Sequence, residues 1–83
     1  MKYRVQLTDI AKKMLAEITD VRVKKKIAER IDKLTNSPDL QGKSLKGIFL
    51  GYRSIRAVGQ RYRIVFKVIE QKLVVYIHRC GDT

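Results

Sequence analysis

The chain has 83 residues, among them 19 Lys or Arg and 8 Asp or Glu, so its formal net charge is +11. Hydrophobic residues make up 45% of the chain, which excludes a basic disordered tail and predicts a single folded domain over residues 1–83. The charge excess is too large for an average surface and favours a polyanionic partner, such as nucleic acid, an anionic membrane or a strongly acidic protein.

The first half of the chain predicts a strand followed by two helices. Residues 2–7 alternate apolar and polar side chains, as in a half-buried strand. Thr8 can cap a helix that extends to about residues 17–19, because apolar residues follow it at four-residue spacing. Asp20 can cap a second helix, which ends before Pro38. The connection between the helices is about two residues long, so we expect an antiparallel hairpin.

The second half predicts a loop at residues 39–47 and then strands. Three segments have the pattern of strands, at about residues 49–57, 61–69 and 72–80. Glu70 and Gln71 form a tight hairpin turn between the last two strands. We therefore predict an α+β domain with the order β-α-α-β-β-β, in which a helical hairpin packs on one face of a small, mostly antiparallel sheet.

The hairpin turn also predicts which residues face each other. A two-residue turn pairs Val65 with Tyr76 and Arg63 with His78. The helices should cover the side of the middle strand that carries Tyr62, because this side is the more apolar one. The uncovered face would then carry four basic or aromatic side chains: Arg63, Lys67, Tyr76 and His78.

Basic residues are concentrated in the second half of the chain. Residues 1–42 contain ten basic and six acidic side chains, whereas residues 43–83 contain nine basic and only two acidic ones. Within eleven residues of the second half lie four arginines, Arg53, Arg56, Arg61 and Arg63. Guanidinium groups bind phosphate oxygens in a bidentate manner, so this concentration predicts a phosphate-binding surface.

The residue inventory excludes several kinds of catalytic site. His78 is the single histidine and Cys80 the single cysteine, so we expect neither a multi-histidine metal site nor a zinc cluster. No glycine-rich phosphate loop precedes a helix, and we expect no cofactor. Cleavage of RNA by attack of a ribose 2′-hydroxyl on the adjacent phosphorus remains possible for these residues. That reaction requires alignment, charge neutralisation and proton carriers, but no metal.

The sequence also favours a location. No apolar run is long enough to span a membrane, and the first residues lack the apolar core of a signal peptide. A lone cysteine cannot form an internal disulfide. We therefore expect a cytoplasmic protein with no membrane partner.

Several segments together resemble one family of proteins. The element order, the KSLKG loop, the segment GYRSIRAVGQRYRIVFKV and the apolar strand ending in Gly81 resemble the RelE/ParE toxin superfamily of bacterial type II toxin–antitoxin modules. RelE-type members are ribosome-dependent mRNA endonucleases that use basic residues in place of the usual His/Glu pair. The resemblance implies a toxin that inhibits translation, with the ribosome, mRNA and an acidic, RelB-like antitoxin as partners.

The resemblance also implies roles for residues. By position, Lys46 corresponds to the basic residue of the loop, and Arg53 and Arg56 correspond to two lysines of the sheet. Arg63 corresponds to a phosphate-binding arginine. The resemblance thus implies that Arg53, Arg56 and Arg63 are catalytic, hold the scissile phosphate together and stabilise the transition state. One extra residue separates Arg53 from Arg56, so we expect a β-bulge at residues 54–55.

The chain departs from the RelE pattern near its end. RelE-type enzymes carry an arginine and then a catalytic tyrosine beyond the last strand, where this chain has Gly81-Asp82-Thr83. Either the chain is shortened, or these roles fall on other residues. His78 is our candidate proton carrier, because a histidine exchanges protons near neutral pH. The further candidates for contact with RNA or phosphate are Arg61, Lys67, Tyr76 and Arg79.

Two alternatives to the endonuclease remain open. The first is a ParE-like inhibitor of DNA gyrase, which has the same fold and kind of partner but no nuclease chemistry. The second is an inactive relic that binds nucleic acid. RNA cleavage on translating ribosomes separates the endonuclease from both, and inhibition of gyrase supercoiling identifies the first alternative.

Overall fold

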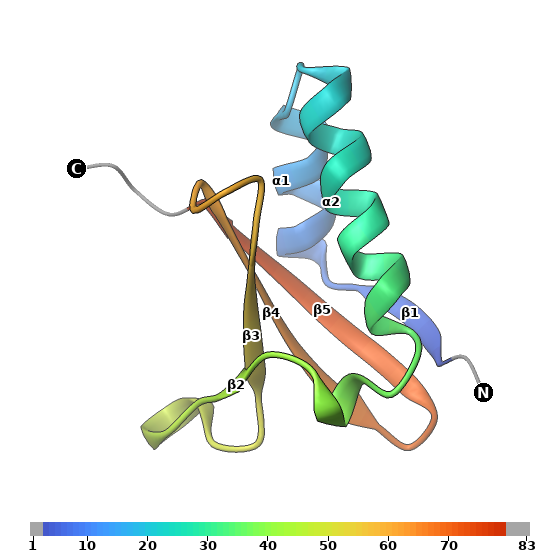
Figure 1. Cartoon of the computed structure of the whole chain (residues 1–83), viewed down its shortest axis with the longest axis vertical. Coiled ribbons are helices and arrows are strands. Elements are labelled where there is room, and N and C mark those ends of the chain that lie inside the picture. Colours follow the sequence, from blue (N-terminus) through green and yellow to red (C-terminus); the bar gives the residue numbers. More distant parts are fainter. Residues whose placement is uncertain (1–2, 80–83) are drawn as a thin grey trace.

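The structure is a computed structural model that describes residues 3–79, and it has the predicted order of elements (Figure 1). The elements are β1 (Arg4–Leu7), α1 (Asp9–Glu17), α2 (Val21–Leu34), β2 (Lys43–Ser44), β3 (Arg53–Ala57), β4 (Tyr62–Ile69) and β5 (Lys72–Arg79). Strand β2 was not predicted, and 3-10 turns form at Pro38–Leu40 and Gly47–Phe49. The predicted strand ends at Lys2 and Cys80 lie outside the described residues.

Both helices begin at the predicted caps. The hydroxyl of Thr8 accepts a hydrogen bond from the backbone N–H of Ala11 at 3.2 Å and donates one to the carbonyl of Val75 on β5 at 3.0 Å. The carboxylate of Asp20 accepts a hydrogen bond from the N–H of Arg22 at 2.9 Å. None of the described helices is long and apolar enough to cross a membrane.

The strands form one sheet in the order β1-β5-β4-β3-β2, and only the β1–β5 pair is parallel. The predicted register is confirmed, because Arg63 lies opposite His78 and Val65 lies opposite Tyr76. Glu70 occupies the β4–β5 turn with a φ of 57°, in the left-handed region. This turn therefore fixes which side chains of β4 and β5 share a face.

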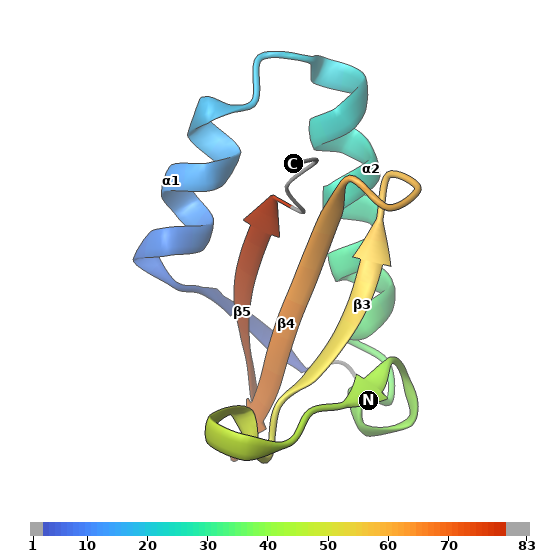
Figure 2. The same ribbon diagram turned by 90° about the vertical axis from the view of Figure 1, so that its left-hand side faces the viewer.

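The helices cover only one face of the sheet, the face that carries Tyr62, as predicted. Figures 1 and 2 show α1 and α2 together on that side. The buried core between helices and sheet includes Ala11, Ile27, Leu34, Ile64, Phe66, Leu73, Val75 and Ile77. We call the opposite side of the sheet the open face. Of its predicted members, Arg63 and His78 are exposed and Lys67 and Tyr76 are half-buried.

Two expectations about β3 are wrong. The strand begins at Arg53 and not near residue 49, because a 3-10 turn and Gly51, with a φ of 95°, precede it. The bulge at residues 54–55 is also absent, since β3 pairs with β4 without interruption from Arg53 opposite Phe66 to Ala57 opposite Tyr62. Successive side chains of an unbroken strand point to opposite faces. Arg53 therefore lies on the helix side and Arg56 on the open face.

Candidate functional site

Three residues form a straight row across the open face, which we call the basic row: Arg56 on β3, Arg63 on β4 and His78 on β5. Arg56 pairs directly with Arg63, and Arg63 pairs directly with His78. Neighbouring strands are about 4.8 Å apart, so the row spans roughly 10 Å. All three side chains are exposed. The row therefore presents two guanidinium groups and an imidazole within the reach of one nucleotide.

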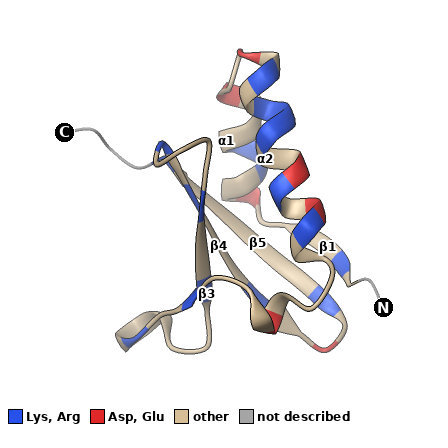
Figure 3. Ribbon diagram, viewed as in Figure 1, with Lys and Arg blue, Asp and Glu red and all other residues tan. Residues whose placement is uncertain are grey.

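The basic row has no acidic neighbour among the described residues. The single ion pair found in residues 3–79 joins Arg22 to Asp20 at 3.7 Å, away from the sheet. Between residues 43 and 79 the only acidic residue is Glu70, in the β4–β5 turn (Figure 3). Like charges directly opposite each other on a sheet destabilise it. The Arg56–Arg63 pair is therefore unfavourable for the stability of the sheet, and an anion between the two guanidinium groups would relieve the repulsion.

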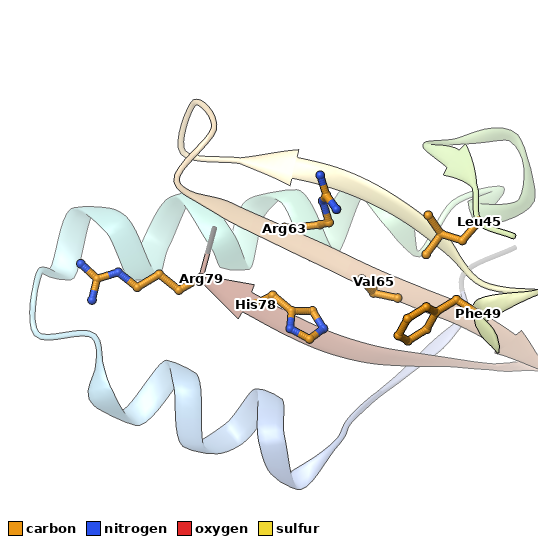
Figure 4. Close-up of a pocket in the computed structure, with 6 residues that line it drawn as sticks. All are labelled: Leu45, Phe49, Arg63, Val65, His78 and Arg79. Atoms are coloured by element: carbon orange, nitrogen blue, oxygen red, sulfur yellow. The ribbon is translucent and has the colours of Figure 1, made fainter. Parts of the chain in front are cut away.

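Two shallow hollows flank the row and share Leu45 and Arg63. The first, of about 440 Å³, is lined by Leu45, Phe49, Arg63, Val65, His78 and Arg79 (Figure 4). The second, of about 420 Å³, is lined by Gly42, Lys43, Leu45, Ser54, Ile55, Arg56 and Arg63. An anion bound at Arg63 would thus have space on both sides.

An aromatic cluster lies beside the row: Phe49, Tyr52 and Tyr76. The ring centroids of Phe49 and Tyr52 are 6.2 Å apart, and those of Tyr52 and Tyr76 are 5.9 Å apart, both edge to face. The Nζ of Lys67 lies 5.1 Å from the centroid of Tyr52, a cation–π contact. Phe49 and Tyr52 were not predicted to lie beside the site, because both fall within the first of the three predicted strands.

The chemistry open to these groups follows from their protonation. Arginine stays protonated, so Arg56 and Arg63 can bind an anion but cannot accept a proton. Hydrogen bonding with Tyr52 raises the pKa of Tyr76 above its ordinary value, with smaller contributions from the charge of Tyr52 and from burial, and Lys67 opposes them. Tyr76 is therefore protonated at neutral pH and cannot be a general base there. The open face also carries His78, whose imidazole nitrogens can donate or accept a hydrogen bond.

Arg53 does not join the basic row. Its Nε donates to the carbonyl of Gln41 at 2.6 Å, its Nη2 to the carbonyl of Gly42 at 2.9 Å and its Nη1 to the hydroxyl of Ser44 at 2.9 Å. These bonds hold residues 41–44 against the edge of the sheet. A Cβ at Gly42 would lie 2.6 Å from the carbonyl oxygen of Ser54, so the loop also packs too closely for a larger residue.

The remaining predicted site residues lie at different distances from the basic row. Lys67 lies in contact with the aromatic cluster. Arg79 lines the first hollow, but Figure 4 shows its side chain pointing away from the other five. Lys46 and Arg61 are exposed and line neither hollow. Among residues 3–79, no three side chains of His, Cys, Asp or Glu come together as metal ligands would.

Comparison of the sequence with known families gives one match. Residues 5–83 match the model of a family described as the ParE toxin of the type II toxin–antitoxin system parDE. The match extends over nearly the whole chain. No curated protein matches the sequence.

Several solved structures have a similar fold. A chain of the RelBE2 toxin–antitoxin complex from Mycobacterium tuberculosis has a TM-score of 0.80 and 22% identity, over 99% of this chain and 95% of that one. The isolated RelE toxin of E. coli has a TM-score of 0.80 and 19% identity, over 98% and 87%. A chain of the chromosomal ParDE system of P. aeruginosa has a TM-score of 0.80 and 15% identity, over 96% and 98%.

Proposed function

The chain belongs to the ParE toxin family of type II toxin–antitoxin systems, and we propose that it acts as a ribosome-dependent mRNA endonuclease. Its fold is shared by RelE and ParE toxins alike, so the fold does not decide between their activities. The observation that carries the proposal is the basic row. It sets two arginines, neither of which forms an ion pair within residues 3–79, beside a histidine on an open face where a phosphate could reach all three.

In this proposal the row acts on one phosphodiester. Arg56 and Arg63 bind the non-bridging oxygens of the scissile phosphate and neutralise the charge that develops as the ribose 2′ oxygen attacks phosphorus. The bond from phosphorus to the 5′ oxygen breaks, which leaves a 2′,3′-cyclic phosphate and a 5′-hydroxyl. His78 donates a proton to the departing 5′ oxygen, and the 2′-hydroxyl proton passes to water.

The other basic residues act at the margins of the row in this proposal. Lys67, Tyr76 and Arg79 contact the nucleotides next to the scissile phosphate, because they lie beside the row or line its hollow. Lys46 and Arg61 contact phosphates further along the strand. Arg53 is left out, since its guanidinium is hydrogen-bonded to residues 41–44.

A second candidate function is inhibition of DNA gyrase, and the description of the matched family favours it. In that case the open face would contact a protein and no bond in RNA would be cut. The unpaired arginines support this candidate less well, because a protein target does not need a row built to bind a phosphate.

We also propose an acidic antitoxin as the partner of the chain. The net charge of +11 suits an acidic segment, and several of the similar structures come from toxin–antitoxin complexes of the RelBE kind. An acidic segment bound over the open face would occupy the basic row and exclude RNA. The ribosomal substrate would place the action of the toxin in the cytoplasm.

The proposal is tested by induced expression of the wild-type chain and of Arg63→Ala, with mapping of new 5′ ends in cellular mRNA. We expect the wild type to arrest growth and to cut mRNA in frame with translation. Loss of one group that stabilises the transition state should reduce cutting by roughly 100-fold or more. Arg63 is exposed, so the variant should still fold.

A charge-matched control is Lys13→Ala, which removes one positive charge from an exposed position on α1. Cutting by this variant should equal that of the wild type. Growth arrest without new mRNA ends would contradict the proposal, and inhibition of gyrase supercoiling by the purified chain would then support the second candidate. Absence of arrest would contradict both.

A further inference from the structure

Phe49 is an aromatic residue that the proposed chemistry does not use. It lies at the end of the 3-10 turn Gly47–Phe49 and is 46% exposed, yet it lines the first hollow together with Arg63 and His78. Figure 4 shows its ring over Val65, on the same side of the sheet as the imidazole of His78. An exposed aromatic ring beside a phosphate-binding row is the arrangement with which proteins bind single-stranded nucleic acid.

The ring of Phe49 is held in place from below. Its edge-to-face contact with Tyr52, which in turn contacts Tyr76, ties it to the sheet. The backbone adds two bonds that close the loop: the N–H of Leu45 donates to the carbonyl of Tyr52 at 3.0 Å, and the N–H of Tyr52 donates to the carbonyl of Phe49 at 3.0 Å. The ring therefore lies over the sheet without having to be ordered by a ligand.

The first hollow has an apolar part and a polar part. Leu45, Phe49 and Val65 form the apolar part, and Arg63 and His78 form the polar part. Arg63 and Val65 are two residues apart on β4, which corresponds to about 7 Å along a strand. This is the scale that separates the phosphate of a nucleotide from its own base. The hollow thus offers an apolar surface for a base and, at one side of it, polar side chains for a phosphate.

We propose that the first hollow is a nucleotide subsite, in which Phe49 stacks on the base of a nucleotide whose phosphate is bound by Arg63 and His78. The inference rests on the proposed function for its substrate, a single-stranded RNA, and adds the residue that contacts the base. An apolar side chain of a protein partner could also contact Phe49. Such a partner would leave the two arginines of the basic row without an anion, so the charge distribution favours the nucleotide.

The test measures binding of short single-stranded RNA probes to the purified chain by fluorescence anisotropy. One probe carries 2-aminopurine, whose fluorescence falls when it stacks, and a matched probe has an abasic site at that position. For Phe49→Ala we expect roughly five- to 100-fold weaker binding of the base-containing probe and loss of the 2-aminopurine quenching. Binding of the abasic probe should not change.

Four further variants separate stacking from other effects on binding. Phe49→Tyr should restore the quenching, whereas Phe49→Leu keeps an apolar side chain but should not. Ile48→Ala is the matched control, because Ile48 is 92% exposed in the same turn and lines neither hollow. Arg63→Ala should weaken binding of both probes alike, since it removes a phosphate contact.

The outcomes distinguish this inference from the proposed endonuclease. Base-dependent binding that is lost in Phe49→Ala, in a chain that cuts no mRNA, would support the subsite and contradict the endonuclease. Cutting of mRNA with equal binding of both probes would do the reverse. The subsite is overturned if the wild type binds no RNA, or if Phe49→Ala weakens both probes equally. It is also overturned if that variant weakens only the complex with an antitoxin.

Discussion

The two faces of the sheet are built from alternate residues of the same strands, yet they differ in almost every property. The helix side of β4 carries Ile64 and Phe66, which are buried at 0% and 1% exposure. The open side carries Arg63 and Lys67, and neither forms an ion pair within the part of the chain that the structure describes. Burial of apolar area on the first face stabilises the folded state. The open face instead carries a like-charged pair, Arg56 and Arg63, which does not stabilise the fold. This contrast is the reason why we propose that the open face is the functional one.

Arg53 and Arg56 give the same contrast within a single strand. Both are arginines of β3, but they are three residues apart, an odd number, so they point to opposite faces. The guanidinium of Arg53 is hydrogen-bonded at three positions, whereas that of Arg56 lies opposite another arginine. The residue type alone therefore does not assign a role. The face of the sheet decides whether the arginine stabilises a loop or is left free for an anion.

The largest effect on stability is expected on the covered face. Phe66→Ala would leave a cavity in the core and lower the free energy of unfolding by about 3–5 kcal/mol. Lys67→Ala, the next residue on the strand, removes a half-buried side chain from the open face and should cost less than about 1 kcal/mol. Urea denaturation followed by circular dichroism measures both. Equal losses would show that the two faces contribute alike and would remove the contrast.

An intermediate effect is expected at Arg53. Arg53→Lys keeps the charge but cannot donate along three directions, so we expect a loss of roughly 1–2 kcal/mol in the free energy of unfolding. Arg56→Lys should change this free energy by no more than about 0.5 kcal/mol, because the side chain of Arg56 is exposed and makes no ion pair with any of residues 3–79. The measurement is again urea denaturation.

Two outcomes would contradict the roles assigned to Arg53 and Arg56. If Arg53→Lys unfolds like the wild type and instead reduces cutting of mRNA, then Arg53 contacts phosphate and the assignment made from its hydrogen bonds is wrong. If Arg56→Lys destabilises the chain, then Arg56 has a structural partner and the basic row is not free.

Much of this arrangement could be predicted from the sequence, because it depends on short-range patterns. The caps at Thr8 and Asp20 and the pairing of Arg63 with His78 follow from local spacing and from a two-residue turn. The position of Arg53 could not be predicted by counting, because a single residue decides its face. The extra residue between Arg53 and Arg56 does not form a bulge, because β3 pairs with β4 at every residue from Arg53 to Ala57.

The aromatic cluster beside the basic row could not be predicted for a different reason. Phe49 and Tyr52 belong to a loop whose path depends on contacts distant in sequence: the bonds from Arg53 to residues 41–44 and the ring contact of Tyr52 with Tyr76. The resemblance predicts a basic residue, Arg53, on the open face next to Arg56. In the structure Ser54 has that open-face position, and Arg53 lies on the helix side. Only the register across strands reveals such an exchange.

The smallest effect concerns the turn that sets the relation between the two faces. Glu70 has a φ of 57°, a conformation that glycine adopts without the steric penalty of a Cβ. Glu70→Gly should therefore raise the free energy of unfolding by about 0.5–1 kcal/mol. Glu70→Gln is the control, because it removes the charge but keeps the Cβ, and it should have no such effect. Both variants should cut mRNA like the wild type, since the turn lies at the far end of β4 from Arg63. A loss of cutting with either variant would show that a change in this turn alters the register that places Arg63 opposite His78.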